Sequence, residues 1–141
     1  MDTVFGERGR KGCLGMKKEM IQTKEAPDAI GPYSQGAAME GMVFTSGQLG
    51  IDLKTGNLAE GVEAQAHAAM RHIGAILKEA GLAYENILKT TIFVKDLGDF
   101  QTVNQVYASY FPGDYPARSC VQVAALPLDG LVEIECVALR R

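Results

Sequence analysis

The sequence has few of the residues that mark metal, redox or disulfide-rich proteins. It contains no tryptophan and only three cysteines, at Cys13, Cys120 and Cys136. No C-x-x-C pair occurs among them, so the zinc and redox centres that use this motif are not indicated. An odd and small number of thiols favours a protein that keeps them reduced, and we therefore expect a cytoplasmic location.

Other functional classes are disfavoured by further absences. No apolar run approaches the roughly 20 residues that a membrane span needs. Lys and Arg number 14 against 17 Asp and Glu, a net charge of -3, so no basic surface for nucleic acid is indicated. The chain has no phosphate-binding glycine loop and no HExxH motif. His67 and His72 are five residues apart and do not share a helix face, so we predict no metal site.

The 141 residues, 47% of them hydrophobic, suffice for one domain with an ordinary core. Residues 1–15, "MDTVFGERGRKGCLG", hold four glycines and few apolar side chains. This composition buries too little to offset its ordering entropy, so we expect a flexible N-terminal extension. The domain is then predicted to span residues 16–141, and Met16 is a plausible natural start.

Periodicity predicts the elements of that domain. Apolar residues from Val62 to Ala80 recur in steps of three and four, which predicts a helix that ends at Gly81. A second helix is predicted from Phe100, with Asp96 and Asp99 as candidate caps. Strands are predicted near residues 20–24, on both sides of Glu40-Gly41, and over 86–97, 117–125 and 131–140. The order is typical of an α+β domain, with a mixed sheet and both helices on one face.

The last two strands carry the most unusual polar residues. Because the connection around Pro127 is short, we predict that they form an antiparallel hairpin. Alternation would then turn Val121 and Val123 toward the helices. The opposite face would carry a polar set made of Arg118, Gln122, Glu133 and Glu135.

This polar face has two interpretations. The simpler one is a solvated surface with weak ion pairs. The other is a pocket bounded by a second copy of the chain, because two helices can cover only one side of the sheet. Arginine binds a carboxylate through two parallel hydrogen bonds, and a nearby glutamate can orient or deprotonate a water. Cys120 is favoured as a packed or backbone-contributing residue rather than a nucleophile, because no histidine is obviously placed to activate it.

Several segments resemble one known family in order: "GPYSQG", "FTSGQLG", "TTIFVKDLGDFQTVNQVY", "YPARSCVQVAALP" and "VEIECVAL". From about residue 20 onward the chain is similar to the RidA/YjgF reactive-intermediate deaminases. The resemblance implies a chorismate-mutase-like fold and a homotrimer with clefts between subunits. It also implies hydrolysis of 2-iminobutanoate and 2-iminopropanoate to 2-oxo acids and ammonia, without a metal or organic cofactor. Such imines arise from enamines that pyridoxal-phosphate-dependent dehydratases release.

The resemblance also assigns roles to residues. Arg118 would bind the substrate carboxylate and Glu133 would position the water. The remaining substrate-binding residues would be Cys120, through its backbone, and the side chains of Tyr33, Ser46 and Asn104. Spacing in the predicted hairpin, which pairs Glu135 with Cys120, instead leaves Glu135 nearer to Arg118. The loop "FPGDY" at residues 111–115 is shorter than in many members and leaves the preferred substrate size open.

Two other functions stay open. A non-catalytic trimer could use the same cleft to bind 2-oxo acids as a regulator. An RNA-directed role, as an endoribonuclease or translation inhibitor, has been attached to some relatives. The acidic domain, without a basic stripe interleaved with aromatic residues, does not favour that role.

Overall fold

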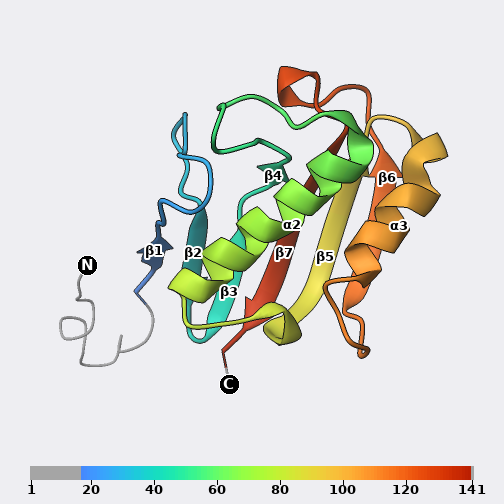
Figure 1. Cartoon of the computed structure of the whole chain (residues 1–141). Coiled ribbons are helices and arrows are strands. Elements are labelled where there is room, and N and C mark those ends of the chain that lie inside the picture. The colour runs from blue at the N-terminus through green and yellow to red at the C-terminus, as the bar shows by residue number, and fades with distance from the viewer. Residues whose placement is uncertain (1–16, 141) are drawn as a thin grey trace.

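The computed structural model describes residues 17–140, which form one sheet with two helices packed on one face (Figure 1). Its strands are β1 (Glu19–Ile21), β2 (Gly36–Met39), β3 (Met42–Thr45), β4 (Gln48–Leu49), β5 (Ile87–Val94), β6 (Ala117–Gln122) and β7 (Val132–Leu139). The helices are α2 (Gly61–Glu79) and α3 (Phe100–Ala108), with short 3₁₀ turns at Tyr84–Asn86, Leu97–Asp99 and Pro127–Asp129. The predicted α+β class and the position of both helices are confirmed, whereas β4 was not predicted. The predicted extension, residues 1–15, lies outside the described residues.

The sheet is mixed, with the strand order β1-β2-β3-β7-β5-β6, and β4 pairs with β7 beside β3. Only β5 and β6 run parallel, and α3 connects them as a crossover. The β2–β3 hairpin turns at Glu40 and Gly41, whose φ angles of 54° and 84° lie in the left-handed region. These values suit the two-residue hairpin turn that the sequence predicts there.

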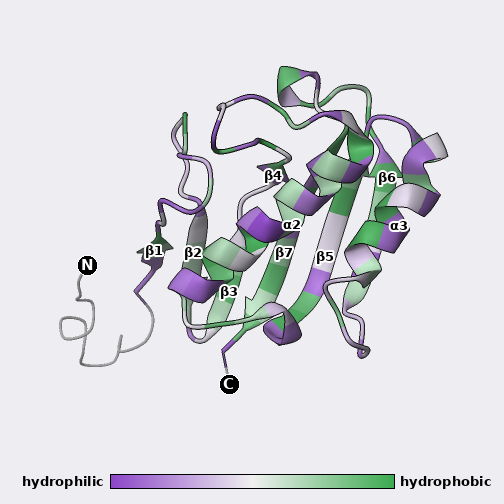
Figure 2. Cartoon of the chain, viewed as in Figure 1, coloured by the Kyte–Doolittle hydropathy of each residue, from purple (hydrophilic) through white to green (hydrophobic). Residues whose placement is uncertain are grey.

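The core lies between the two helices and the sheet. The buried face of α2 follows the predicted helical spacing and includes Ala66, Met70, Ile73 and Leu77. Facing strand residues alternate with outward-pointing ones, as the burial of every second residue of β7 shows. In Figure 2 the part of β7 that is visible beside α2 has the colour of apolar residues, and α2 has both polar and apolar turns. No helix among residues 17–140 is both long and apolar enough to span a membrane.

The predicted hairpin between β6 and β7 is wrong. β5 lies between them: Thr90 pairs with Arg118 on one side and with Cys136 on the other. The connection after β6 instead crosses the end of β5, where Val123 N donates to Val94 O at 3.0 Å. β6 is therefore an edge strand, and the predicted register of Glu135 with Cys120 does not exist.

The predicted polar face is wrong for the same reason. Residues paired across a ladder share a face, so Arg118 lies on the helix side with Thr90. Glu133 pairs with Phe93, and both lie on the opposite side. Val121 is on that side too and is 44% exposed, so it does not pack against the helices as predicted. Among the described residues, no helix covers this second side, on which Phe44 is 48% exposed.

Candidate functional site

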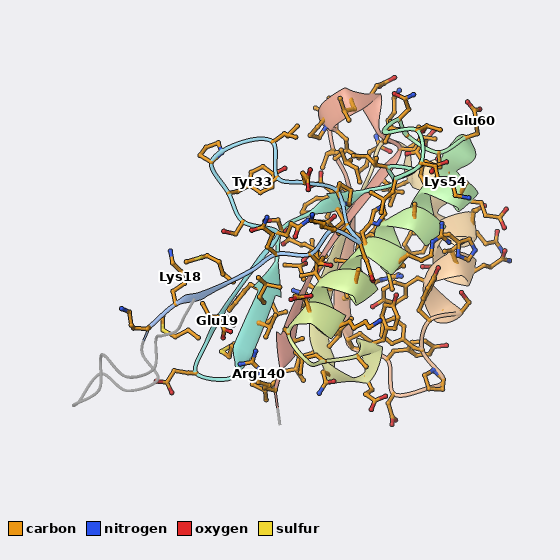
Figure 3. The ribbon with its side chains drawn as sticks, turned by 60° about the vertical axis from the view of Figure 1, so that its left-hand side comes forward. Lys18, Glu19, Tyr33, Lys54, Glu60 and Arg140 are labelled. Carbon is orange, nitrogen blue, oxygen red and sulfur yellow. The ribbon has the colours of Figure 1, made fainter. Side chains whose placement is uncertain are left out.

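A cavity of about 630 Å³ lies on the side of the molecule where the β1–β2 loop meets the start of β7. Its lining includes three of the predicted site residues, Tyr33, Ser46 and Glu133. Figure 3 shows the loop that carries Tyr33 standing out from the sheet. The cavity size suits a small-molecule site, for which volumes of about 300–1,000 Å³ are usual.

The loop that presents Tyr33 is fixed by a buried glutamine. The Gln35 side-chain amide donates to the carbonyl oxygens of Ala26 and Pro27, at 3.3 and 2.7 Å. Its Oε1 accepts from Thr23 N at 2.7 Å. One side chain therefore links three points of a loop with little secondary structure of its own. Tyr33 itself is 50% exposed at the cavity.

Ser46 joins the same loop to the end of β3. Its Oγ donates to Ser34 O at 2.6 Å, and its backbone N–H donates to Gln35 O at 2.8 Å. The hydroxyl proton is thus used within the fold. The Ser46 oxygen keeps a lone pair with which it can accept a hydrogen bond from a ligand.

Glu133 reaches the cavity from β7, where it lies between Leu49 of β4 and Phe93 of β5. Burial raises the pKa of the Glu133 carboxyl above its ordinary value of 4.5, and the charge of Glu135 on the same face raises it further. Glu135 is not among the residues that line the cavity. A carboxylate with a raised pKa is a better proton acceptor near neutral pH than an exposed one.

Gly47 makes room for this carboxylate. A Cβ added at Gly47 would collide with Glu133 Oε2, so a side chain at residue 47 would displace the end of the Glu133 side chain from its present position. The sequence analysis assigned no role to Gly47 or Gln35, although they lie within the motifs "FTSGQLG" and "GPYSQG". A glycine directly after a strand and a glutamine between two loop glycines were the available signals.

The other predicted residues lie elsewhere, near α3. Arg118 and Cys120 point from edge strand β6 to the helix side of the sheet, and both are partly buried. The Arg118 Cζ lies 5.1 Å from the Tyr107 ring centroid and 5.5 Å from that of Phe100. Among residues 17–140, the Arg118 guanidinium forms no ion pair with a carboxylate. Burial raises the pKa of the Cys120 thiol, which makes this residue a weak nucleophile.

Asn104 lies on α3 with its amide oxygen buried. Among the described residues, Asn104 Oδ1 has no hydrogen-bond partner. A buried acceptor of this kind is costly unless a ligand or water satisfies it. The six predicted residues thus form two groups on different sides of the sheet: Tyr33, Ser46 and Glu133 at the cavity, and Arg118, Cys120 and Asn104 beside α3.

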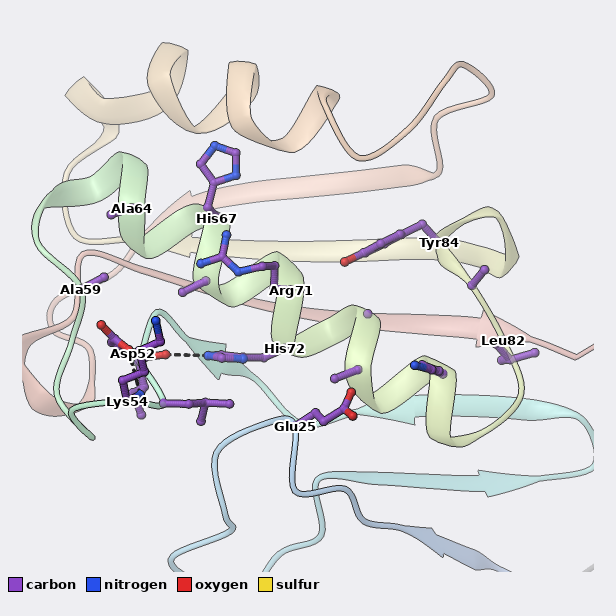
Figure 4. A pocket seen from close by; sticks show the side chains of 17 residues that line it. Glu25, Asp52, Lys54, Ala59, Ala64, His67, Arg71, His72, Leu82 and Tyr84 are labelled. Carbon is purple, nitrogen blue, oxygen red and sulfur yellow. Dashed lines mark hydrogen bonds between the residues drawn. The ribbon is translucent and has the colours of Figure 1, made fainter.

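A larger hollow of about 1010 Å³ runs along the outer side of α2 (Figure 4). It is lined by helix residues such as His67 and Arg71 and by the loop around Asp52. Within it, His72 Nε2 lies 2.7 Å from Ile51 O, which fixes that loop to the helix. None of the predicted site residues lines this hollow.

Comparisons with known proteins agree with the motifs. The model of a family described as endoribonuclease L-PSP matches residues 23–140. A 2-iminobutanoate/2-iminopropanoate deaminase of Salmonella typhimurium is 52% identical over 124 residues, which cover 86% of this chain and 97% of the relative. Reactive Intermediate Deaminase A, chloroplastic, of Arabidopsis thaliana is 50% identical over 124 residues, 87% of this chain but 66% of the relative. The crystal structure of E. coli TdcF with bound serine matches with a TM-score of 0.84 and 46% identity, over 87% of this chain and 99% of TdcF.

Proposed function

Because the chain belongs to the YjgF/RidA family, we propose that it hydrolyses short-chain 2-imino acids to 2-oxo acids and ammonia. The proposed substrates are 2-iminobutanoate and 2-iminopropanoate, which form when pyridoxal-phosphate-dependent dehydratases release enamines. The observation that carries the proposal is a small cavity holding a carboxylate of raised pKa, in a chain that also presents an arginine without a carboxylate partner among residues 17–140.

The substrate's charged end suggests the role of Arg118. A guanidinium that is not paired with a protein carboxylate keeps its N–H groups available, and its planar fork matches the two oxygens of a substrate carboxylate. We propose that this contact orients the adjacent C=N carbon. Positioning is the larger contribution, because a protonated imine is already electrophilic.

The hydrolysis needs a positioned water. In the proposed step, Glu133 accepts a proton from the water as its oxygen bonds to the imine carbon and the C=N π electrons move to nitrogen. Glu133 then returns this proton to the nitrogen of the carbinolamine. The C–N bond breaks as the hydroxyl oxygen forms the C=O bond, and the hydroxyl proton is taken up by the departing ammonia, so the products are the 2-oxo acid and ammonium. The backbone of Cys120 and the Asn104 oxygen are proposed to accept hydrogen bonds from the substrate nitrogen, and Tyr33 and Ser46 to line the site. No metal or organic cofactor enters this scheme.

The two groups of residues require a second chain to meet. Arg118 and Glu133 lie on opposite sides of their own sheet, so one chain does not bring them together. We propose a homotrimer of chorismate-mutase-like domains in which Arg118 of one copy faces the Glu133 cavity of the next. The sheet side that carries exposed Phe44 and Val121 supports this assembly, because its burial against a neighbour would remove apolar surface from water.

The thiols support a cytoplasmic location. Cys120 and Cys136 are both free, and Cys136 is buried beside Thr45, whose hydroxyl lies 3.9 Å from its Sγ. Buried unpaired thiols are typical of proteins kept in a reducing compartment.

The test is a threonine dehydratase reaction with and without the purified chain, with semicarbazide present to trap surviving imine. The proposal predicts faster formation of 2-oxobutanoate and less trapped imine. A non-catalytic regulator would bind 2-oxobutanoate but leave the yield of trapped imine unchanged, which would refute the proposed catalysis. Steeply salt-dependent RNA binding without any effect on the imine would favour the RNA-directed role that the family's description names.

A further inference from the structure

Arg118 lies over two aromatic rings of α3. Phe100 and Tyr107 are seven residues apart, so they lie on the same face of the helix, two turns from each other. Their ring centroids are 5.5 and 5.1 Å from Arg118 Cζ, both within the range of a cation–π contact. We call these two rings the aromatic platform.

The platform is itself fixed to the sheet. The Tyr107 hydroxyl and Thr90 Oγ1 are 2.7 Å apart in a buried hydrogen bond. Thr90 is the residue of β5 that pairs with Arg118 of β6, so the bond joins the platform to the strand position beside the guanidinium. Phe111 also packs on Tyr107, with a centroid separation of 4.9 Å and tilted rings.

The nature of the contact matters for ligand binding. A carboxylate partner would occupy the N–H groups of Arg118 and compete with a substrate carboxylate. An aromatic ring attracts the guanidinium through the ring quadrupole and leaves those N–H groups available. It also restricts a long side chain that would otherwise lose rotamer freedom on binding.

We propose that Phe100 and Tyr107 are positioning residues, which hold the Arg118 guanidinium in place to receive the substrate carboxylate, with Thr90 fixing Tyr107. The inference rests on the proposed function, because it assigns Arg118 to a carboxylate ligand. It adds residues that act through Arg118 and do not themselves touch the reacting atoms.

The primary variant is Phe100→Leu. Phe100 is 38% exposed, so its truncation leaves the core packed. Binding of 2-oxobutanoate, measured by calorimetry, weakens about 3- to 20-fold, the range expected for loss of a partly desolvated cation–π contact. The same loss acts on the ground state and the transition state, so KM rises while kcat stays within about twofold. Tyr107→Phe keeps the ring and loses only the bond to Thr90, and it has a smaller effect in the same direction.

The matched control is Tyr110→Leu. Tyr110 lies just after α3, and its hydroxyl and ring contact His67 and Tyr84 rather than Arg118. This variant removes a partly buried ring at similar cost to packing but leaves 2-oxobutanoate binding unchanged. Repeating Phe100→Leu in an Arg118→Met background has less than about a twofold effect, because no cation remains for the ring to position. Equal losses in Phe100→Leu and Tyr110→Leu, or a full effect without Arg118, would overturn the inference.

A second readout does not depend on activity. Because Arg118 lies over both ring faces, the inference predicts that ring currents shift its Nε–H resonance upfield in NMR spectra. Phe100→Leu moves it downfield and Tyr110→Leu does not; an unchanged resonance in Phe100→Leu contradicts the inference. If the wild-type chain neither binds 2-oxobutanoate nor hydrolyses imine, the proposed function fails, and the resonance alone decides whether the platform holds Arg118. If the wild-type chain binds 2-oxobutanoate and hydrolyses imine, but Phe100→Leu changes neither ligand binding nor the resonance, only the inference fails.

Discussion

Glu133→Gln is expected to lose activity and gain stability at the same time. The substitution keeps the shape of the side chain and removes its charge. Without the carboxylate, no group accepts the proton of the attacking water, so kcat falls about 10²- to 10⁴-fold. Stability changes in the opposite direction, because the raised pKa of Glu133 means that the fold disfavours its charged form.

Burial is the larger cause of the raised pKa of Glu133, and repulsion from Glu135 is the second, whose size can be worked from the strand spacing. Two residues along a strand span about 7 Å. Two charges at that distance repel by about 0.6 kcal/mol in water and about 2 kcal/mol at an effective dielectric of 20. Glu133 is only partly buried, so we expect about 1 kcal/mol once solvent screening is included. For a domain of this size, that raises Tm by about 2–4 °C at pH 7.

The stability gained by Glu133→Gln depends on pH, and its sign follows from the direction of the pKa shift of Glu133. A carboxyl whose pKa is raised in the folded state destabilises the fold when it is ionised, at pH values above the folded pKa. As the pH falls through the folded pKa the cost declines, and below the ordinary value of 4.5 it is absent in both states. The Tm gain of Glu133→Gln therefore disappears near pH 4, at fixed protein concentration.

The assay pairs thermal unfolding at pH 4 and 7 with steady-state deamination. Glu135→Gln is the control, since it removes the repelling charge but not the cavity carboxylate, and it should gain part of the Tm while keeping kcat within a few-fold. A Glu133→Gln protein that stays fully active would show that the reasoning is wrong. The same conclusion would follow if the difference in Tm between variant and wild type were less favourable at pH 7 than at pH 4. If kcat were lost in Glu135→Gln instead, Glu135 would be the residue that accepts the proton of the water.

Two further predictions concern the neighbours of these groups. Arg118→Lys keeps the charge but loses the planar guanidinium, so kcat/KM in the dehydratase-coupled assay is expected to fall at least about 100-fold. The oligomer mass measured by light scattering should be unchanged. A near-wild-type kcat/KM would exclude carboxylate binding by Arg118. Gly47→Ala adds a Cβ against Glu133 Oε2 and displaces the carboxylate, so kcat is expected to fall about tenfold or more. The variant should still unfold in one cooperative transition. An unaltered kcat would show that the position of Oε2 is not critical.

Local patterns in the sequence were sufficient for most elements. The three-and-four spacing of Ala66, Met70 and Ile73 identifies α2, and the β-branched run of residues 90–94 identifies β5. The turn at Glu40-Gly41 was predicted because this dipeptide, with its glycine, separates two short apolar segments. Each of these signals lies within one element or one turn, where the chain's own geometry determines the outcome.

The neighbours of β6 could not be obtained in this way. Alternation determines which residues share a face of one strand, but not which strand lies alongside. Arg118 was predicted to face outward because Val121 and Val123, on the other face of its strand, were turned toward the helices. The two rings of α3 that contact Arg118 come from a different element. Val121 looked like a core residue, yet it lies on the side that no helix covers among residues 17–140.

The residue assignments of the site came from the family resemblance rather than from spacing. In the structure, Tyr33, Ser46 and Glu133 line one cavity, although they are far apart in the sequence. The roles of all six residues stay predictions. Gly47 and Gln35 act through close packing and loop bracing, which a single sequence does not reveal.

The central claim is that Arg118 and Glu133 of different chains form one site. Arg118→Lys and Glu133→Gln chains, each inactive alone, can be given different affinity tags, refolded together and purified through both tags. In such mixed trimers, one of the three interfaces combines an intact arginine with an intact glutamate, so the account predicts about one third of wild-type deaminase activity. Activity no higher than that of the two parent variants would contradict it.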